Sequence, residues 1–331
     1  MGNRFTEHAG CRVPLICGAM YPCSNRELVA AASAAGALGV VQPLSLVYAH
    51  DQDLRESLRW ILETAQAPIG FNAIVEKSVK SYEQRMRAWV AIALEEGVRF
   101  FVTALGNPRW VVDAVHDRGG YVYHDVTERK WAEKALAQGV DGLICVNSEA
   151  GGHAGARSPE ELLAELQPLG VPLVSAGGVG NPETFGNRLA LGYDGVQAGT
   201  RFIATKECRV PDDYRRAIVE ATAEDIVLTN KLSGVPCAVI RTPQIDRLGA
   251  DARGLGAWLL RNPRTKHWMR TFYTMRSLRS LKRSLRRGLG NRDVWQAGAS
   301  VAGIDGVLSA RDVVEQFERA LDAGPSGATP R

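Results

Sequence analysis

The sequence predicts an α/β fold, a TIM (β/α)8 barrel with a mostly helical insertion before its C-terminal helix. Short apolar runs alternate with helical segments as far as about residue 208, and eight such runs can be counted. Alternation of strands and helices is typical of a parallel sheet that is covered by helices. Most of the runs are continuously apolar, as expected for strands that are buried on both faces.

The expected strands lie at residues 14–17, 38–42, 68–73, 98–104, 121–124, 142–146, 172–176 and 195–198. Segments with helical spacing lie between them, at 25–35, 81–96, 128–137, 159–166 and 182–191. An open dinucleotide-binding sheet is the alternative, and it requires a G-x-G-x-x-G turn after the first strand. The turn at 18–23 reads G-A-M-Y-P-C, which favours the barrel.

The alternation stops at residue 209. Helices are expected at 212–222 and at 310–321. Between them, arginines recur at helical spacing, with leucines on a neighbouring face of the expected helix, at Arg276, Arg279, Arg283 and Arg286. We therefore divide the chain into a barrel of residues 1–208 and 300–331 and a mostly helical, basic insertion of residues 209–299. The insertion is expected to cover the mouth of the barrel.

Positive charge is concentrated in this insertion. Twelve lysine and arginine residues and no acid occur within 253–292. The net charge of the whole chain is +4, so the net charge of the rest of the chain is about −8. The segment is either a solvated helix face or a site for the phosphates of a nucleotide or of coenzyme A, and an amphipathic helix on acidic lipid is a third alternative. Nucleic acid is not expected as a partner, because the acid-free stretch is short and follows an enzyme-like barrel.

Composition narrows the class of protein. Apolar residues make up 45% of the chain and charged residues 23%, which is ordinary for a soluble globular protein. No run approaches the ~20 apolar residues that span a membrane, and the N-terminus has no apolar core of a secretory signal. The six cysteines form no C-x-x-C pair, so no metal site is expected. A reduced, cytoplasmic location is the expectation, and a homodimer is one open alternative for the oligomeric state.

Two glycine-rich turns predict a phosphate site. The seventh expected strand ends in S-A-G-G-V-G at 175–180, directly before a helix, and the eighth ends in Q-A-G-T-R at 197–201. Glycines let the backbone approach an anion, and the N–H groups at a helix N-terminus attract it. Barrels bind phosphate after strands seven and eight, which is where these turns lie.

The loop after the sixth expected strand contains the candidate catalytic residue. It reads N-S-E-A-G-G-H-A-G at 147–155, so small residues flank His153 on both sides. An imidazole exchanges protons near neutral pH because its ordinary pKa is near 6.5. We therefore predict that His153 is catalytic.

Together these segments resemble the nitronate monooxygenase family, formerly called 2-nitropropane dioxygenases, over nearly the whole barrel. The matching residues are P-L-I-C-G-A-M at 14–20, G-F-N at 70–72, E-A-G-G-H-A-G at 149–155, A-G-G at 176–178 and Q-A-G-T-R-F at 197–202. A weaker match is W-Q-A-G-A-S at 295–300, where the chain re-enters the barrel. The same fold and histidine loop serve flavin-dependent enoyl-acyl-carrier-protein reductases and NADH:quinone reductases.

The resemblance implies FMN, bound without a covalent link. It places Gly18, Ala19, Met20 and Asn72 beside the flavin ring and Gly177, Gly178, Gly199 and Thr200 at the phosphate, with Asp125, Ala150, Gly151, Ser175 and Gln197 completing the cofactor site. Asp125 stands where some relatives have a lysine or glutamine that contacts the cofactor, and the first loop, 21–24, also differs from that of the family.

The implied activity is oxidation of an alkyl nitronate with O2 to a carbonyl compound and nitrite. His153 would bind the nitronate or act as an acid or base. The alternative is an NAD(P)H-dependent flavin reductase that acts on an enoyl thioester, of CoA or an acyl carrier, or on a quinone. In either case the main partner is a small-molecule substrate, with a CoA or nucleotide phosphate as a candidate ligand of the basic insertion.

Overall fold

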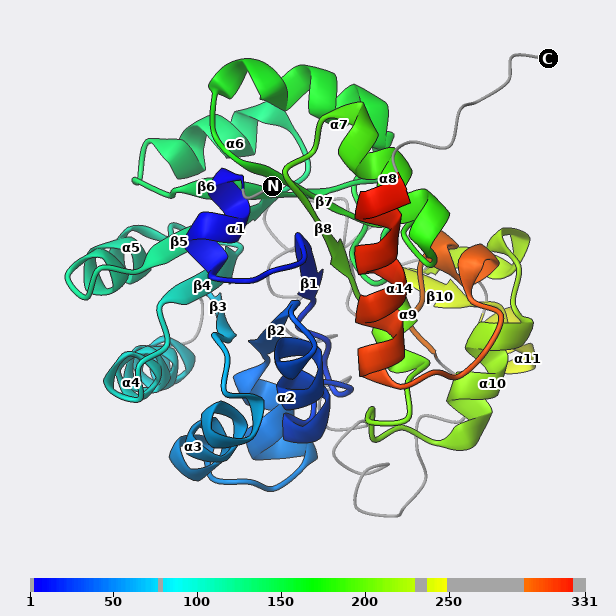
Figure 1. Ribbon diagram of the computed structural model, residues 1–331, viewed down its shortest axis with the longest axis horizontal. Helices are drawn as coiled ribbons and strands as arrows, with labels where there is room; N and C mark the ends of the chain where they lie inside the picture. Colours follow the sequence, from blue (N-terminus) through cyan, green and yellow to red (C-terminus); the bar gives the residue numbers. More distant parts are fainter. Residues whose placement is uncertain (1–2, 77–79, 230–236, 249–294, 324–331) are drawn as a thin grey trace.

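Eight parallel strands close into a barrel in the order of the sequence, with the eighth pairing to the first (Figure 1). The computed structural model describes residues 3–76, 80–229, 237–248 and 295–323. The strands are β1 (Leu15–Cys17), β2 (Leu38–Val41), β3 (Gly70–Ile74), β4 (Phe100–Ala104), β5 (Tyr121–Val126), β6 (Gly142–Val146), β7 (Leu173–Ala176) and β8 (Gly195–Ala198). Each falls on one of the eight expected runs, so the TIM-barrel prediction is confirmed.

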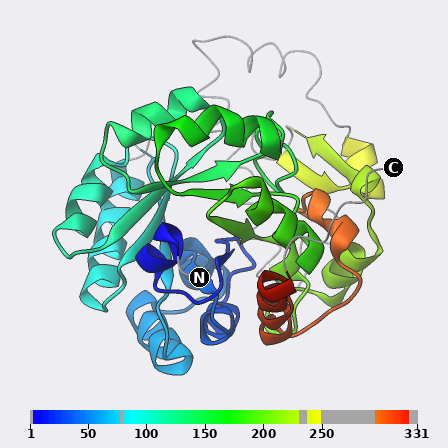
Figure 2. The same cartoon turned by 45° about the horizontal axis from the view of Figure 1, so that its top comes forward.

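A ring of helices surrounds the strands. Its members are α2 (Arg26–Ala34), α3 (Leu54–Ala65), α4 (Lys80–Glu95), α5 (Arg109–His116), α6 (Arg129–Leu136), α7 (Pro159–Leu166), α8 (Pro182–Leu191) and α14 (Ala310–Ala323). The last of these, α14, packs against both α8 and α2 and so closes the ring (Figures 1 and 2). The expected helices did not include α3 and α5. None of the helices in the described part is long and apolar enough to cross a bilayer.

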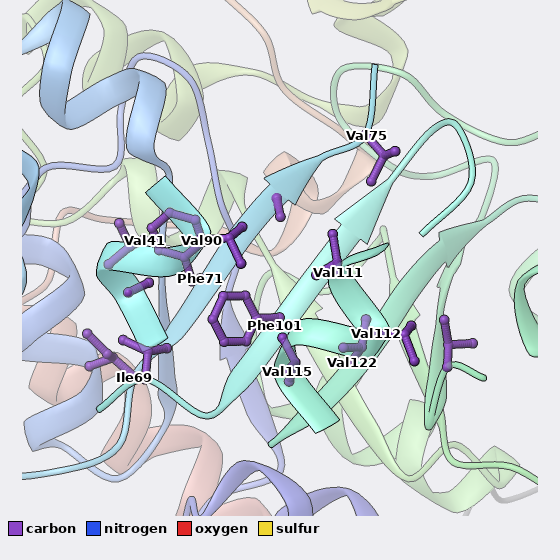
Figure 3. Packing of buried hydrophobic residues seen from close by; sticks show 14 of the residues in the cluster. Val41, Ile69, Phe71, Val75, Val90, Phe101, Val111, Val112, Val115 and Val122 are labelled. Carbon is purple, nitrogen blue, oxygen red and sulfur yellow. The ribbon is translucent and has the colours of Figure 1, made fainter. Parts of the chain in front are cut away.

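Alternation along the strands divides the apolar side chains into two layers. Phe100, Val102 and Tyr123 point into the barrel and belong to an interior cluster. Their neighbours Phe71, Phe101 and Val122 point outward and pack under the helices, where Val90 of α4 and Val111, Val112 and Val115 of α5 cover them (Figure 3). This alternation fixes which residues at the strand ends face the barrel axis.

A short N-terminal helix, α1 (Arg4–Ala9), covers the end of the barrel that lies opposite the mouth. Its Phe5 is fully buried and packs against Phe100 and Tyr123, with ring centroids 6.0 and 5.9 Å apart. This helix was not among those expected from the sequence. Helix α1 thus closes one end of the barrel. The other end, where the strands have their carboxyl ends, is the mouth.

Helices α7 and α8 begin at defined caps. Ser158 accepts a hydrogen bond from the Glu161 N–H, and Asn181 accepts one from the Thr184 N–H, each within a reciprocal capping box. A proline occupies the first turn of both helices, where its missing N–H costs nothing. Helix α8 therefore starts directly after the glycine turn that follows β7.

The described part of the insertion combines helices with a small sheet. Helix α10 (Asp212–Glu220) lies on the helix expected at 212–222, and α11 (Pro243–Leu248) follows later. Between them, β9 (Ile226–Thr229) and β10 (Cys237–Ile240) pair antiparallel, which a mostly helical insertion did not predict. The basic stretch 253–292, with its arginine stripe, lies outside the described residues. The division of the chain at 208 and 299 stays a prediction.

The chain returns to the barrel at Trp295. The Trp295 ring stacks on Tyr214 of α10, with centroids 5.8 Å apart, and its carbonyl accepts a hydrogen bond of 2.8 Å from the Ile240 N–H. The Tyr214 hydroxyl donates to the Gln296 carbonyl over 2.5 Å. A 3-10 turn, η4 (Ala299–Gly303), then leads towards α14. The insertion is thus fastened to the returning chain.

Candidate active site

The predicted site residues lie on one rim of the barrel. Because all eight strands are parallel, their carboxyl ends meet at the same mouth. The rim or the loops that follow it contain Gly18, Ala19, Met20, Asn72, Asp125, Ala150, Gly151, His153, Ser175, Gly177, Gly178, Gln197, Gly199 and Thr200. The chain thus brings together residues as far apart in the sequence as Gly18 and Thr200.

The turn after β7 can be built only with glycine. Gly177 and Gly178 have φ angles of +122° and +80°, which side chains rarely adopt. A Cβ on Gly177 would overlap Asn147 Oδ1 and would lie 2.6 Å from the Ala150 nitrogen. The Asn147 amide in turn donates to the Gly177 carbonyl over 3.3 Å. The loops after β6 and β7 are therefore packed backbone against backbone.

Two charged residues that the sequence analysis did not single out hold this turn from the other side. A Cβ on Gly178 would overlap Glu149 Oε2. Arg188 of α8 donates from Nη2 to that same oxygen over 2.5 Å and from Nη1 to Glu160 over 3.3 Å. The Arg188 side chain is only 12% exposed and that of Glu149 is 38% exposed, so this ion pair is partly shielded from solvent. The partners are distant in the sequence, and no local pattern indicates that they meet.

The turn after β8 contacts both the first loop and the returning chain. A Cβ on Gly199 would lie 3.4 Å from Met20 Sδ. Thr200 is buried, and its hydroxyl oxygen accepts a hydrogen bond from the Gly298 N–H over 3.1 Å. A hydroxyl that accepts one bond still has its own proton to donate. Thr200 can therefore donate towards an anion at this turn.

The loop that bears His153 is fastened on two sides. Gly152 exchanges two backbone hydrogen bonds with Ala238 of β10, donating over 3.3 Å and accepting over 2.7 Å. A Cβ on Gly151 would lie 2.8 Å from the Gly298 nitrogen. Gly152 thus extends the small sheet of the insertion. This explains why the loop needs glycines and why the insertion matters for the position of the histidine.

His153 itself is accessible at the barrel mouth. The protein around it still removes enough water to lower the pKa of the imidazole below its ordinary value of 6.5. The neutral form therefore predominates at pH 7. A neutral imidazole can accept a proton at one nitrogen and donate a hydrogen bond from the other.

Two polar residues line the barrel interior below the mouth. Asn72 of β3 pairs in register with Val102, which points inward, and Asn72 is buried. Asp125 of β5 follows Tyr123 by two residues and so faces the same interior. Its Oδ1 is inaccessible to solvent and has no hydrogen-bond partner. Desolvation raises the pKa of Asp125 to about 7.

Leu105 is a further residue at the mouth that the sequence analysis missed. It directly follows β4, has a φ angle of +63°, and is 61% exposed. A leucine in this left-handed region is strained, and such strain is concentrated at functional sites. Leu105 offers an apolar contact beside the mouth.

These features fit a flavin mononucleotide. Two glycine turns and the Thr200 hydroxyl make a cradle for a phosphate, and the start of α8 adds the N–H groups of a helix N-terminus. The interior offers an orphaned polar atom, Asp125 Oδ1, beneath the mouth over which a ring system would lie. The residues present can therefore hold both ends of FMN.

Comparison with known proteins identifies the family of this chain. A family model described as nitronate monooxygenase matches residues 3–318. A (3aS,4S,5R,7aS)-5-hydroxy-7a-methyl-1-oxo-octahydro-1H-indene-4-carboxyl-CoA dehydrogenase from Mycobacterium tuberculosis is 28% identical over 260 residues, which is 77% of this chain and 71% of that protein. A probable nitronate monooxygenase from Staphylococcus saprophyticus is 25% identical over 292 residues, 75% of this chain and 81% of that protein. The structure of FabK from Thermotoga maritima superposes with a TM-score of 0.79 at 24% identity, covering 98% of this chain and 97% of that one.

Proposed function

Because this chain belongs to the nitronate monooxygenase family, whose members are FMN-dependent oxidoreductases, we propose that it oxidises an alkyl nitronate with O2 to a carbonyl compound and nitrite. The position of His153 supports this most directly, since the loop is fastened at the mouth while the imidazole stays accessible. Leu105, which is exposed beside the mouth, suits the apolar part of such a substrate.

In this proposal the phosphate of FMN is held by Gly177, Gly178, Gly199 and Thr200. The ring system lies against Gly18, Ala19, Met20 and Asn72, and the remaining contacts come from Asp125, Ala150, Gly151, Ser175 and Gln197. Bound FMN supplies the redox chemistry, because its ring accepts electrons and passes them on. The protein contributes orientation, electrostatics and the exclusion of water.

His153 has two roles open to it, which depend on the form of the substrate. The neutral imidazole accepts the α-proton of a nitroalkane, and its other nitrogen donates a hydrogen bond to a nitronate oxygen. The first role makes the anion in the site, and the second holds an anion that arrives preformed. The lowered pKa favours the neutral form that both roles need.

Anaerobic mixing tests the proposal. Propionate-3-nitronate should bleach the flavin absorbance of the purified holoprotein, and admission of oxygen should restore it with release of nitrite. NADH and NADPH should leave the flavin oxidised. A flavin that propionate-3-nitronate does not reduce, but that NADH or NADPH does, would contradict the proposal.

An acyl thioester is the second candidate substrate. The relative from M. tuberculosis is named as a dehydrogenase of a carboxyl-CoA compound. The twelve basic residues of 253–292 could pair with the phosphates of such a ligand. In that case an acyl-CoA or an enoyl-CoA, the latter in the presence of NADPH, would change the flavin spectrum, and a nitronate would not.

A further inference from the structure

Asp125 occupies an unusual place for a carboxylic acid. It lies in β5 opposite Ile144 of β6, and Ile144 belongs to the cluster that fills the barrel interior. Tyr123, two residues earlier, belongs to the same cluster. The carboxyl group therefore points into the barrel, one layer above the apolar filling and directly below the mouth.

The carboxyl group lacks a partner on one side. Oδ1 is inaccessible to solvent and makes no hydrogen bond, although the residue as a whole keeps partial contact with solvent at the mouth. Leaving a buried polar atom unsatisfied costs about 1–3 kcal/mol, so folded proteins seldom do it without a reason. The missing partner is most simply a group that binds over the mouth.

Among the residues that the structure describes, no cation pairs with Asp125. Desolvation raises its pKa. His124 faces the other side of the sheet, where its Nδ1 lies 2.8 Å from Thr103 Oγ1, and burial lowers its pKa to about 4. Burial raises the pKa of the Cys145 thiol on the neighbouring strand. Both groups are uncharged at pH 7. Among these three side chains, only the protonation state of Asp125 changes the charge below the mouth.

We propose that Asp125 carries a proton in the holoprotein and donates a hydrogen bond to the ring system of FMN. A carboxylic acid has a donor and an acceptor, whereas a carboxylate has acceptors only. The flavin ring bears carbonyl oxygens and unprotonated ring nitrogens that act as acceptors, and an ionised carboxylate facing them would repel them, most strongly once the ring has taken up electrons. The inference depends on FMN and not on the substrate, so it stands or falls separately from the nitronate proposal.

Flavin affinity as a function of pH tests the inference. If only the protonated form of Asp125 binds well, the dissociation constant of riboflavin, which lacks the titrating phosphate of FMN, should rise about tenfold from pH 6 to pH 8. Asp125→Asn keeps a donor and cannot ionise, so its dissociation constant should not change over that range. Because bound flavin keeps Asp125 protonated, the variant and the unaltered protein should have the same difference in flavin midpoint potential at pH 6 and at pH 8.

A measurement on the unaltered protein covers the case in which Asp125→Asn folds poorly. Calorimetric titrations with riboflavin at pH 7.5, in two buffers of different ionisation enthalpy, should show net proton uptake on binding. Parallel pH profiles for the protein and the variant, or binding without proton uptake, would overturn the inference.

Discussion

Arg188 donates over 2.5 Å to the Glu149 carboxylate, and this ion pair lies against the Cα of Gly178. Glu149 belongs to the His153 loop, Gly178 to the predicted phosphate turn, and Arg188 to the helix that follows this turn. The Glu149 carbonyl also accepts a hydrogen bond of 3.0 Å from the Ala299 N–H. One ion pair therefore joins the histidine loop, the phosphate cradle and the returning chain.

Arg188→Gln should weaken FMN binding about tenfold, or ~1.4 kcal/mol. The substitution leaves the Glu149 carboxylate beside the phosphate turn without its cation, so repulsion of the phosphate should follow. Flavin fluorescence titration gives the dissociation constant. Adding Glu149→Gln should restore most of the affinity, because the repelling charge is then gone.

Arg129→Gln is the matched control for this ion pair. Arg129 pairs with Glu133 one turn along α6, where both side chains are about half exposed. Exposed pairs contribute little, so FMN affinity should not change. If Arg188→Gln and the unaltered protein bind FMN equally well, the Arg188–Glu149 pair only holds α8 against the His153 loop and does not affect the phosphate site.

Gly178→Ala should abolish FMN binding in protein that is still folded. The φ angle of +80° strains any side chain, and the added methyl group would displace Glu149 from its place beside the turn. Gly186→Ala in α8 is the control, because no described atom beyond its chain neighbours and the backbone of its own helix lies within 4 Å of the added methyl group. That change should raise stability by roughly 0.5–1 kcal/mol, since alanine favours helix. Retention of FMN by Gly178→Ala would argue against a phosphate at this turn.

His153→Gln should lower kcat/KM by roughly 10²–10⁴ with a nitroalkane substrate, the range expected for loss of a general base. With the unaltered enzyme, the neutral imidazole is the active form. Since desolvation lowers the pKa of His153 below 6.5, activity should reach a plateau near neutral pH and fall as the pH drops below 6.5. Steady-state rates from pH 5 to 8 measure this profile.

His116→Gln provides the comparison for His153. His116 lies at the end of α5, where its Nε2 is 2.9 Å from Asp141 Oδ2, and it is far from the mouth in the fold. Both the rate and the profile should be unaffected. A profile that is unchanged in His153→Gln would show that another group titrates.

The barrel could be predicted from the sequence because its information is local. Each strand is an apolar run such as F-F-V-T-A at 100–104, and its neighbour in the barrel is its neighbour in the chain. The glycine turns and the small residues around His153 were also readable, because they are contiguous.

What could not be predicted depends on contacts across the sequence. The strands β9 and β10 are four residues each, and they are completed by Gly152 and the chain at 295–296, which no window around them contains. The Glu149–Arg188 pair could not be predicted for the same reason, because Glu149 lies in the loop after β6 and Arg188 lies in α8. The missing partner of Asp125 required the interior of the barrel to be known, since only burial distinguishes it from an ordinary acid.

The N-terminal helix gives a stability test that leaves the mouth untouched. Phe5 is fully buried between Phe100 and Tyr123 at the closed end of the barrel, so Phe5→Ala should cost about 3–5 kcal/mol of unfolding free energy. Trp131→Ala is the control. Trp131 is 45% exposed on α6, and the ammonium groups of Lys130 and Lys134 lie over its ring, so its loss should cost below about 1 kcal/mol. Urea unfolding of the apoprotein gives both values. FMN affinity should be unchanged in each variant that remains folded, because the packed interior separates the two ends of the barrel. A loss of FMN binding in Phe5→Ala at low urea would show that the closed end also sets the geometry of the mouth.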